Sequence, residues 1–323
     1  MTSDEALHGL SPDRGRGRFL DDRMHADLAS SLRHVAERTE DAVQEISRRI
    51  MSLAVALEGG RRVPPLAFRQ YFRLVQAVLT EDFTSVQSAL DRMEALGARD
   101  DDRRVRYFGA PEADQVSLEL ISDGMRLAPI TQHEAEAFEL LLEQGLALMQ
   151  RSLPELHAEI DGMVREILFA RAPHGDRMEF DGASHYQFWG LLLLNPSHHR
   201  TPLAVVEVLA HEASHSMLFA LTRTEPLVFN PDDELYPSPL RIDPRPMDGI
   251  YHATFVSARM WWAMDQLSRS EVLSPDDRAL ARDAAEKDRA NWTMGMKVID
   301  AHARLSPTGA RMLEGTRIAM TAG

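Results

Sequence analysis

The chain has 323 residues, of which 44% are hydrophobic, so it can bury the core of one large domain or two modest ones. Its 50 acidic residues outnumber its 36 basic ones, and the formal charge of −14 disfavours binding to nucleic acid or anionic membranes. The absence of cysteine excludes disulfides, thiolate metal sites, a cysteine nucleophile and a cysteine-bound iron–sulfur cluster. Any metal must therefore bind to histidine and carboxylate side chains.

The N-terminal residues contain no apolar run of the kind found in secretion signals, and the aliphatic run at 190–196 is too short to cross a bilayer. We therefore expect a cytoplasmic protein that does not bind a membrane. Residues 1–22 lack helical periodicity, which predicts a mobile leader. Apolar residues then recur at helical spacing over 24–57, predicting one long helix, and over 67–96, predicting a second helical region. Residues 97–114 carry mixed charges and are predicted to form a surface connection.

Start and stop signals define the elements of the middle of the chain. Thr131 and Glu134 form a capping box, which predicts a helix to about Met149. After Pro154 another helical pattern continues to about Ala170. The apolar segment 184–196, bounded by turn residues, is the best candidate for a strand, either buried or at a sheet edge.

The C-terminal half is predicted to be helical around one long loop. Thr201 and Pro202 supply an N-cap and a first-turn proline, so residues 201–224 should form one helix of about five turns. Prolines are frequent between 225 and 246, which predicts an ordered or partly ordered loop. Further helices are predicted over 249–267, from a Ser274 cap to about Leu305, and in a short final segment.

These patterns together predict a mainly helical α+β fold, in which the helix over 201–224 packs on a small β-sheet. We divide the chain into a mobile leader at 1–22, an N-terminal helical region at 23–130 and a metal-binding catalytic region at 131–323. The last two regions can form one continuous domain.

The helix over 201–224 carries the pattern His-Glu-x-x-His at His211, Glu212 and His215. Residues four apart on a helix lie on one face, so both imidazoles can point at one metal ion. Their neighbours are apolar, which favours metal ligands over the alternative of two core histidines. Glu212 lies about 100° further round the helix and is expected beside the ion, as a general base or to orient water or substrate.

A catalytic metal with three protein ligands needs a third residue downstream. We favour His252, because it stands at the start of a predicted helix and a rigid element can deliver its imidazole to the ion. Alternatively, His252 caps its own helix or packs near Trp261. Asp243 and Asp248 are further candidates.

Glu234 is the second choice for the third ligand. Eighteen residues separate it from His215, which equals the spacing in gluzincin aminopeptidases. Those enzymes carry this glutamate on a helix, whereas Pro231 and Pro237 leave room here for at most one helical turn. His185 and Tyr186, just before the predicted strand, could also approach the metal or the substrate.

Two arginines, Arg241 and Arg245, precede His252 in the proline-rich loop. A guanidinium can hold a carboxylate through two parallel hydrogen bonds, so this pair indicates a carboxylate cosubstrate or an acidic group of the substrate. Ion pairs with the aspartates of the same loop are an equally good interpretation.

Three segments, LLLLNP at 191–196, VLAHEASH at 208–215 and YPSPLRIDPRPMDGIYHATF at 236–255, follow each other at characteristic separations. In this respect the chain resembles, over about residues 185–260, the HExxH-motif peptide-modification proteins found with ribosomally made, post-translationally modified peptides in bacteria. Ala253 stands where that family has glycine, and the N-terminal third has no counterpart.

The resemblance implies an Fe(II)- and 2-oxoglutarate-dependent dioxygenase that β-hydroxylates a side chain of a precursor peptide, its partner. His211, His215 and His252 would then be the metal ligands. Arg245 or Arg241 would hold the far carboxylate of 2-oxoglutarate. Three histidines depart from the familiar set of two histidines and one carboxylate, which leaves the identity of the metal open.

Two other functions are compatible with the same residues. A zinc peptidase would use Glu212 as its general base, with the strand at 190–196 as an edge for an extended substrate. A helical scaffold or peptide-binding protein would retain the metal helix without chemistry.

Overall fold

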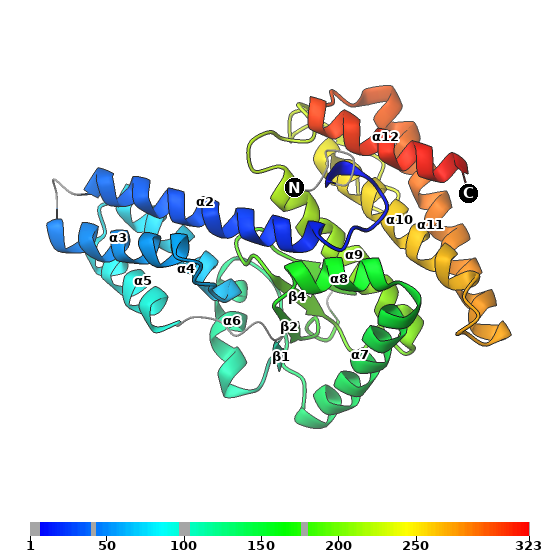
Figure 1. Cartoon of the computed structure of the whole chain (residues 1–323), viewed down its shortest axis with the longest axis horizontal. Coiled ribbons are helices and arrows are strands. Elements are labelled where there is room, and N and C mark those ends of the chain that lie inside the picture. Colours follow the sequence, from blue (N-terminus) through cyan, green and yellow to red (C-terminus); the bar gives the residue numbers. More distant parts are fainter. Residues whose placement is uncertain (1–6, 40–42, 97–103, 176–179, 323) are drawn as a thin grey trace.

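The computed structural model describes residues 7–39, 43–96, 104–175 and 180–322. Within these ranges the protein is a mainly helical α+β fold, as predicted, with eleven helices, 65% helix and a four-stranded mixed sheet. Figure 1 shows an arm of helices on one side, the sheet in the middle and the C-terminal helices on the other side. No helix in the described ranges is both long enough and apolar enough to cross a membrane.

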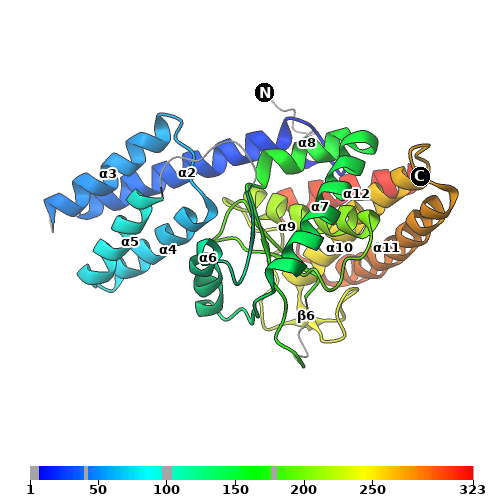
Figure 2. The same cartoon turned by 90° about the horizontal axis from the view of Figure 1, so that it is seen from below.

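Four helices form the arm, and α2 and α3 run side by side in it (Figures 1 and 2). They are α2 (Arg16–Thr39), α3 (Gln44–Glu58), α4 (Pro65–Leu79) and α5 (Phe83–Ala95). The single helix predicted over 24–57 is therefore wrong, because the chain reverses between α2 and α3. The helical region over 67–96 also divides, at a turn in which Glu81 adopts φ 55° and Asp82 caps α5.

Three parallel strands and one antiparallel strand form the sheet, in the order β1-β2-β4-β3. They are β1 (Arg104–Tyr107), β2 (Glu166–Phe169), β3 (Gly182–Ser184) and β4 (Leu191–Leu194). The predicted strand over 184–196 is confirmed for β4, which is fully buried in the interior of the sheet. The strand at the edge beside β4 is β3.

Two strands contradict the expectations for their segments. Residues 104–107 form β1 instead of a surface connection, while 97–103 lie outside the described residues. The helix predicted to reach Ala170 ends as α8 (Pro154–Met163), and β2 follows. β2 is buried at every position, and a short apolar run has no periodicity that distinguishes a strand from a helix.

The helices around the sheet begin largely where their signals predict. Thr131 and Glu134 form the capping box of α7 (Gln132–Ser152), whereas α6 (Pro111–Ser122) was not predicted. Thr201 caps α9 (Pro202–Leu221), and its hydroxyl accepts a hydrogen bond from the Ala204 N–H. Ser274 likewise caps α11 (Pro275–His302). The remaining elements are β5 (Leu235–Tyr236), β6 (Arg245–Pro246), α10 (Met247–Ser268) and α12 (Pro307–Ala322).

The N-terminal segment is packed into the fold from residue 7, contrary to the mobile leader predicted over 1–22; residues 1–6 lie outside the described residues. Leu10 and Leu20 are buried, and Arg16 is completely buried at the start of α2. This helix crosses α8 closely, because a Cβ atom at Gly17 would lie only 1.9 Å from the carbonyl oxygen of Glu159.

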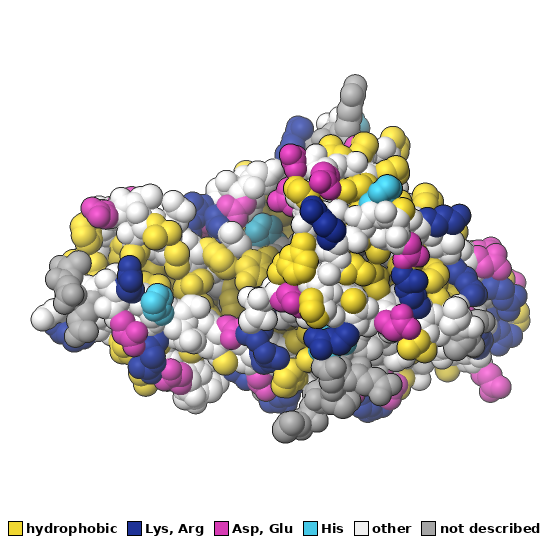
Figure 3. Space-filling model, turned by 90° about the horizontal axis from the view of Figure 1, so that it is seen from above, with side chains coloured by type: hydrophobic (Ala, Val, Ile, Leu, Met, Phe, Trp, Pro, Cys, Tyr) yellow, Lys and Arg dark blue, Asp and Glu magenta, His cyan; other side chains and the backbone are white. Residues whose placement is uncertain are grey.

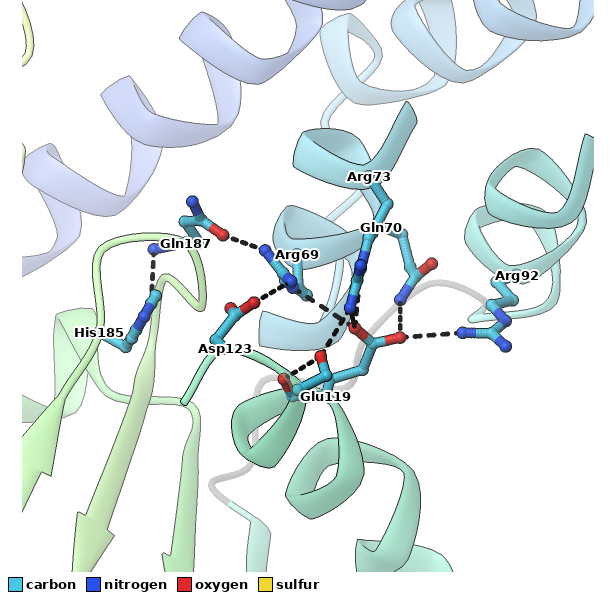
Figure 4. Close-up of polar contacts among 9 residues, drawn as sticks. Arg69, Gln70, Arg73, Arg92, Glu119, Asp123, His185 and Gln187 are labelled. Carbon is cyan, nitrogen blue, oxygen red and sulfur yellow. Dashed lines mark hydrogen bonds and ion pairs between the residues drawn. The ribbon is translucent and has the colours of Figure 1, made fainter. Parts of the chain in front are cut away.

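A cluster of ion pairs joins the arm to α6 (Figure 4). Glu119 of α6 accepts hydrogen bonds from Gln70, Arg73 and Arg92 of the arm. Burial alone would raise the pKa of Glu119, but the Gln70 hydrogen bond and the charges of Arg73 and Arg69 outweigh burial and lower it. Glu119 is buried, whereas Arg73 and Arg92 are about half exposed. The cluster therefore links α4 and α5 of the arm to α6, and loss of the arginines would leave a buried carboxylate unpaired.

Candidate metal centre

Two helices bring the three predicted histidines together. His211 and His215 lie one turn apart on α9, and their Nε2 atoms are 3.1 Å apart. His252 lies in the second turn of α10, with its Nδ1 atom 3.0 Å from His215 Nδ1. The three imidazoles therefore form a row with His215 in the middle.

Burial makes all three imidazoles neutral at physiological pH. It lowers the pKa of His211 to about 4, and the charge of Arg241 lowers this pKa further, against a smaller raising effect of Asp181. Burial also lowers the pKa of His215, to which His211 and His252 add. The pKa of His252 is lowered by burial against the charge of Asp248. A neutral imidazole presents a free lone pair, which is the form that binds a metal ion.

Three neutral imidazoles are suitable ligands for a divalent metal ion, but in this structure their nitrogen atoms do not point at one common position. In the described ranges no three His, Cys, Asp or Glu side chains are arranged to hold an ion as they stand. The reason is that His215 turns Nε2 toward His211 and Nδ1 toward His252, whereas an ion takes one nitrogen from each ring. For one ion to bind all three rings, at least one imidazole must turn from its position in this structure.

Glu212 is directed toward the edge strand β3. Its side chain is only 5% exposed, and its Oε1 lies 3.8 Å from His211 Nε2. A Cβ atom at Gly182 would lie 2.8 Å from Glu212 Cγ, so the strand leaves room for this carboxyl group only because residue 182 is glycine. Burial raises the pKa of Glu212 to about 8, against a hydrogen bond with the Ser184 hydroxyl. Without an ion nearby, Glu212 therefore holds a proton at neutral pH.

The two loop arginines differ in their surroundings. Arg241 is exposed and makes no hydrogen bond or ion pair with any other described residue, and its charge helps to lower the pKa of both His211 and Glu212. Arg245 pairs with Asp243 at 2.8 Å, and its Nε–H is buried without a hydrogen-bond partner in the described ranges. The loop thus carries one exposed guanidinium without a partner in the described ranges, whose charge acts on His211 and Glu212, and a second, partly paired one.

The other candidate ligands lie in different positions. Glu234 accepts a 2.7 Å hydrogen bond from the Tyr236 hydroxyl on the surface, and Arg304 lies 3.9 Å away. Asp248 Oδ2 lies 3.9 Å from His252 Nε2. His185 Nδ1 accepts a hydrogen bond from the Gln187 N–H, at the margin of the Glu119 cluster drawn in Figure 4. Of the two main candidates for the third ligand, His252 lies beside the histidines of α9, whereas Glu234 lies on the surface with Tyr236.

A buried group of charges that the sequence did not predict lies against α9, the helix of His211 and His215. Glu159 of α8 pairs with Arg16 of α2 and with Arg259 of α10, and all three side chains are almost inaccessible. Arg259 Nε also donates to the hydroxyl of Ser214, the residue before His215, at 3.2 Å. Because removing one member leaves a buried charge unpaired, these contacts hold α9 firmly in place. Arg16 stands among other Arg and Gly residues, so nothing in its pattern indicates burial.

Two further side chains that were not predicted contact the imidazoles. Met260 places its sulfur 3.1 Å from His211 Nδ1. Phe219, one turn after His215 on α9, lies 6.4 Å from the His215 ring and 5.7 Å from the His252 ring, centroid to centroid. The sequence contains a signal only for Phe219, because it stands four residues after His215 on the same helix. Met260 comes from α10 and has no such signal.

Comparison of the sequence with models of known protein families finds no match, and no curated protein matches the chain either.

Proposed function

We propose that this chain is an Fe(II)- and 2-oxoglutarate-dependent oxygenase that β-hydroxylates a side chain of a ribosomally made precursor peptide. The observation that supports this function best is Arg241, a guanidinium without a partner in the described ranges, whose charge helps to lower the pKa of His211 in the row of neutral imidazoles. A dicarboxylate cosubstrate needs both features, because one end binds the metal and the other needs a cation. The motif resemblance over residues 185–260 favours the same reaction.

Each residue of the site has a defined part in this proposal. His211, His215 and His252 would hold the ion, and iron supplies the oxygen chemistry when 2-oxoglutarate is decarboxylated to succinate. Arg241 would bind the far carboxylate, and Arg245 would contribute its unpaired Nε–H. Beside a divalent ion Glu212 would be ionised, so it would accept a hydrogen bond from the peptide or from water and orient that group.

The proposal is tested by turnover without peptide. Protein loaded anaerobically with Fe(II) should convert 2-oxoglutarate slowly to succinate once oxygen is admitted. Arg241→Gln should raise the KM for 2-oxoglutarate roughly 10-fold to 100-fold, because a hydrogen bond to a charged group contributes about 1.5–3 kcal/mol. Arg282→Gln, an exposed arginine of α11, is the matched control and should leave KM unchanged. Bound zinc together with no effect of 2-oxoglutarate would contradict the proposal.

One observation favours a zinc peptidase as the second candidate. β3 is antiparallel to β4, and its outer edge pairs with no strand in the described part of the chain. An extended peptide could add to this edge beside Glu212, which would act as the general base. Peptide cleavage that Glu212→Gln abolishes, with zinc still bound, would favour this function. Protein that binds no metal would favour the scaffold instead.

A further inference from the structure

A cavity of about 280 Å³ lies where the arm meets the end of the metal helix. Helices α2 and α4 form one side of it, and Arg223 and Thr224, just after α9, form the other. On the face drawn in Figure 3, hydrophobic side chains gather in the hollow between the arm and the rest of the molecule. None of the roles proposed above for the histidines or the loop arginines uses this cavity.

Aromatic rings dominate one wall of the cavity, with Phe68, Tyr71, Phe72 and Tyr186 among its lining residues. Tyr71 and Phe72 meet edge to face at 5.3 Å, and Phe72 meets Tyr186 in the same way at 5.7 Å. Aromatic edges and faces attract a further ring in the same geometry. A cavity of about 150 Å³ already accepts benzene, so this one has room for an indole or a phenol ring.

The lining also has a polar part. Asp27 of α2 and Arg223 form an ion pair there, and the Asp27 side chain is 44% exposed. An exposed carboxylate oxygen can accept a hydrogen bond from an indole N–H or a phenol O–H. The cavity therefore combines an apolar body with a polar end, which matches the side chain of Trp or Tyr.

Aromatic contacts connect the cavity with the histidines. Tyr186 meets Phe219 at 6.0 Å, and Phe219 lies 5.7 Å from the His252 ring. These two contacts together set the greatest possible distance between the Tyr186 and His252 rings. An extended chain advances about 3.3–3.6 Å per residue, so about three or four residues of peptide are enough to cover it. One peptide can thus reach the cavity and the row of imidazoles together.

We propose that this cavity binds an aromatic side chain of the peptide substrate, three or four residues from the residue that is modified. The identity of the ligand as a peptide rests on the proposed function. The preference for an aromatic ring rests on the cavity alone, and the two are tested separately.

The test uses the metal-free full chain and two capped amino acids, N-acetyl-tryptophanamide and N-acetyl-alaninamide. Saturation-transfer NMR should detect binding of the tryptophan compound and no binding of the alanine compound. Ser31→Trp on α2 places a ring in the cavity and should weaken binding at least tenfold. Ala26→Trp adds the same ring at an exposed position of α2 that does not line the cavity; it is the control and should bind like the original protein. Phe72→Leu keeps the apolar volume but removes an aromatic edge, and should weaken binding about threefold to tenfold.

The outcomes distinguish the cavity from the proposed reaction. Equal binding of both compounds, or unchanged binding by Ser31→Trp with a melting temperature like that of Ala26→Trp, would overturn the inference. Binding of the tryptophan compound that Ser31→Trp weakens supports the aromatic cavity, whether or not the protein consumes 2-oxoglutarate. A lack of 2-oxoglutarate consumption would refute only the oxygenase proposal. If Ser31→Trp does not fold, Phe72→Leu decides, because unchanged binding by that variant would overturn the preference for aromatic rings.

Discussion

Asp288 on α11 has a buried carboxyl group, and its contacts with the described residues do not fully offset its loss of contact with water. Its side chain is 1% exposed, and its Oδ2 atom has no hydrogen-bond partner in the described ranges. Burial raises the pKa of Asp288 from 3.8 to about 8, and the nearby Glu207 carboxylate adds to the shift. The folded protein therefore holds this proton over a pH range in which the unfolded chain has lost it.

This difference predicts how stability depends on pH. Between about pH 4 and pH 8 the unfolded chain binds fewer protons at Asp288, so the contribution of this group to the free energy of unfolding falls as pH rises. Asp288→Asn cannot ionise, and it should raise the free energy of unfolding by about 1–3 kcal/mol at pH 8 and by less at pH 5. Urea unfolding at the two pH values measures this. Asp283→Asn, exposed on the same helix, is the control, and equal shifts at both pH values would contradict the assignment.

The sequence predicts single residues of the site where local geometry decides their position. The helical repeat alone places His211 beside His215, and it places Glu212 on a different face. The approach of His252 depends on how α10 packs on α9, and that packing has no signal in the sequence. Gly182 and Ser214 act through contacts with residues distant in the chain, and for that reason they were missed.

Among the elements, the crossing of α2 and α8 has the least free space. Because a Cβ atom at Gly17 would lie 1.9 Å from a backbone oxygen of α8, Gly17→Ala must push the helices apart. We expect it to lower the free energy of unfolding by about 1–3 kcal/mol or more, the usual effect of overpacking. Thermal and urea unfolding measure the change.

The matched control for the helix crossing is Gly15→Ala, where the nearest atom to a new Cβ is 3.4 Å away. It should change stability far less. Because Glu159 also holds Arg259, which contacts Ser214 on α9, Gly17→Ala should weaken metal binding as well. Identical stability and metal affinity in the two variants would show that α8 does not support the metal helix.

Prediction of elements succeeded where caps define a helix and failed at β1, at β2 and at the break between α2 and α3. The capping side chains at Thr131, Thr201 and Ser274 mark the starts of α7, α9 and α11. β2 is a short strand with both faces covered, so it lacks the alternation that identifies a strand. The break between α2 and α3 was missed because both helices continue the same apolar spacing.

For the whole molecule, contacts between distant segments determine where the site lies. The Glu119 cluster joins the arm to α6, and the Arg16–Glu159–Arg259 group joins α2, α8 and α10 and contacts Ser214 of α9. The arm also completes the aromatic cavity beside the histidines. The mainly helical α+β fold was predicted correctly from the sequence, but these long-range ion pairs were not, because each joins segments that local patterns treat separately.

The central claim is that His211, His215 and His252 bind one divalent ion. X-ray absorption of the anaerobically prepared Fe(II) protein tests it most directly, because the spectrum counts imidazole ligands without any need for activity. We expect one iron per chain with three imidazole nitrogens, and two in His252→Ala. His302→Ala, a histidine at the end of α11, is the control and should retain three. An iron spectrum that does not change in His252→Ala would contradict the assignment of the third ligand, and the absence of bound iron would contradict the metal centre.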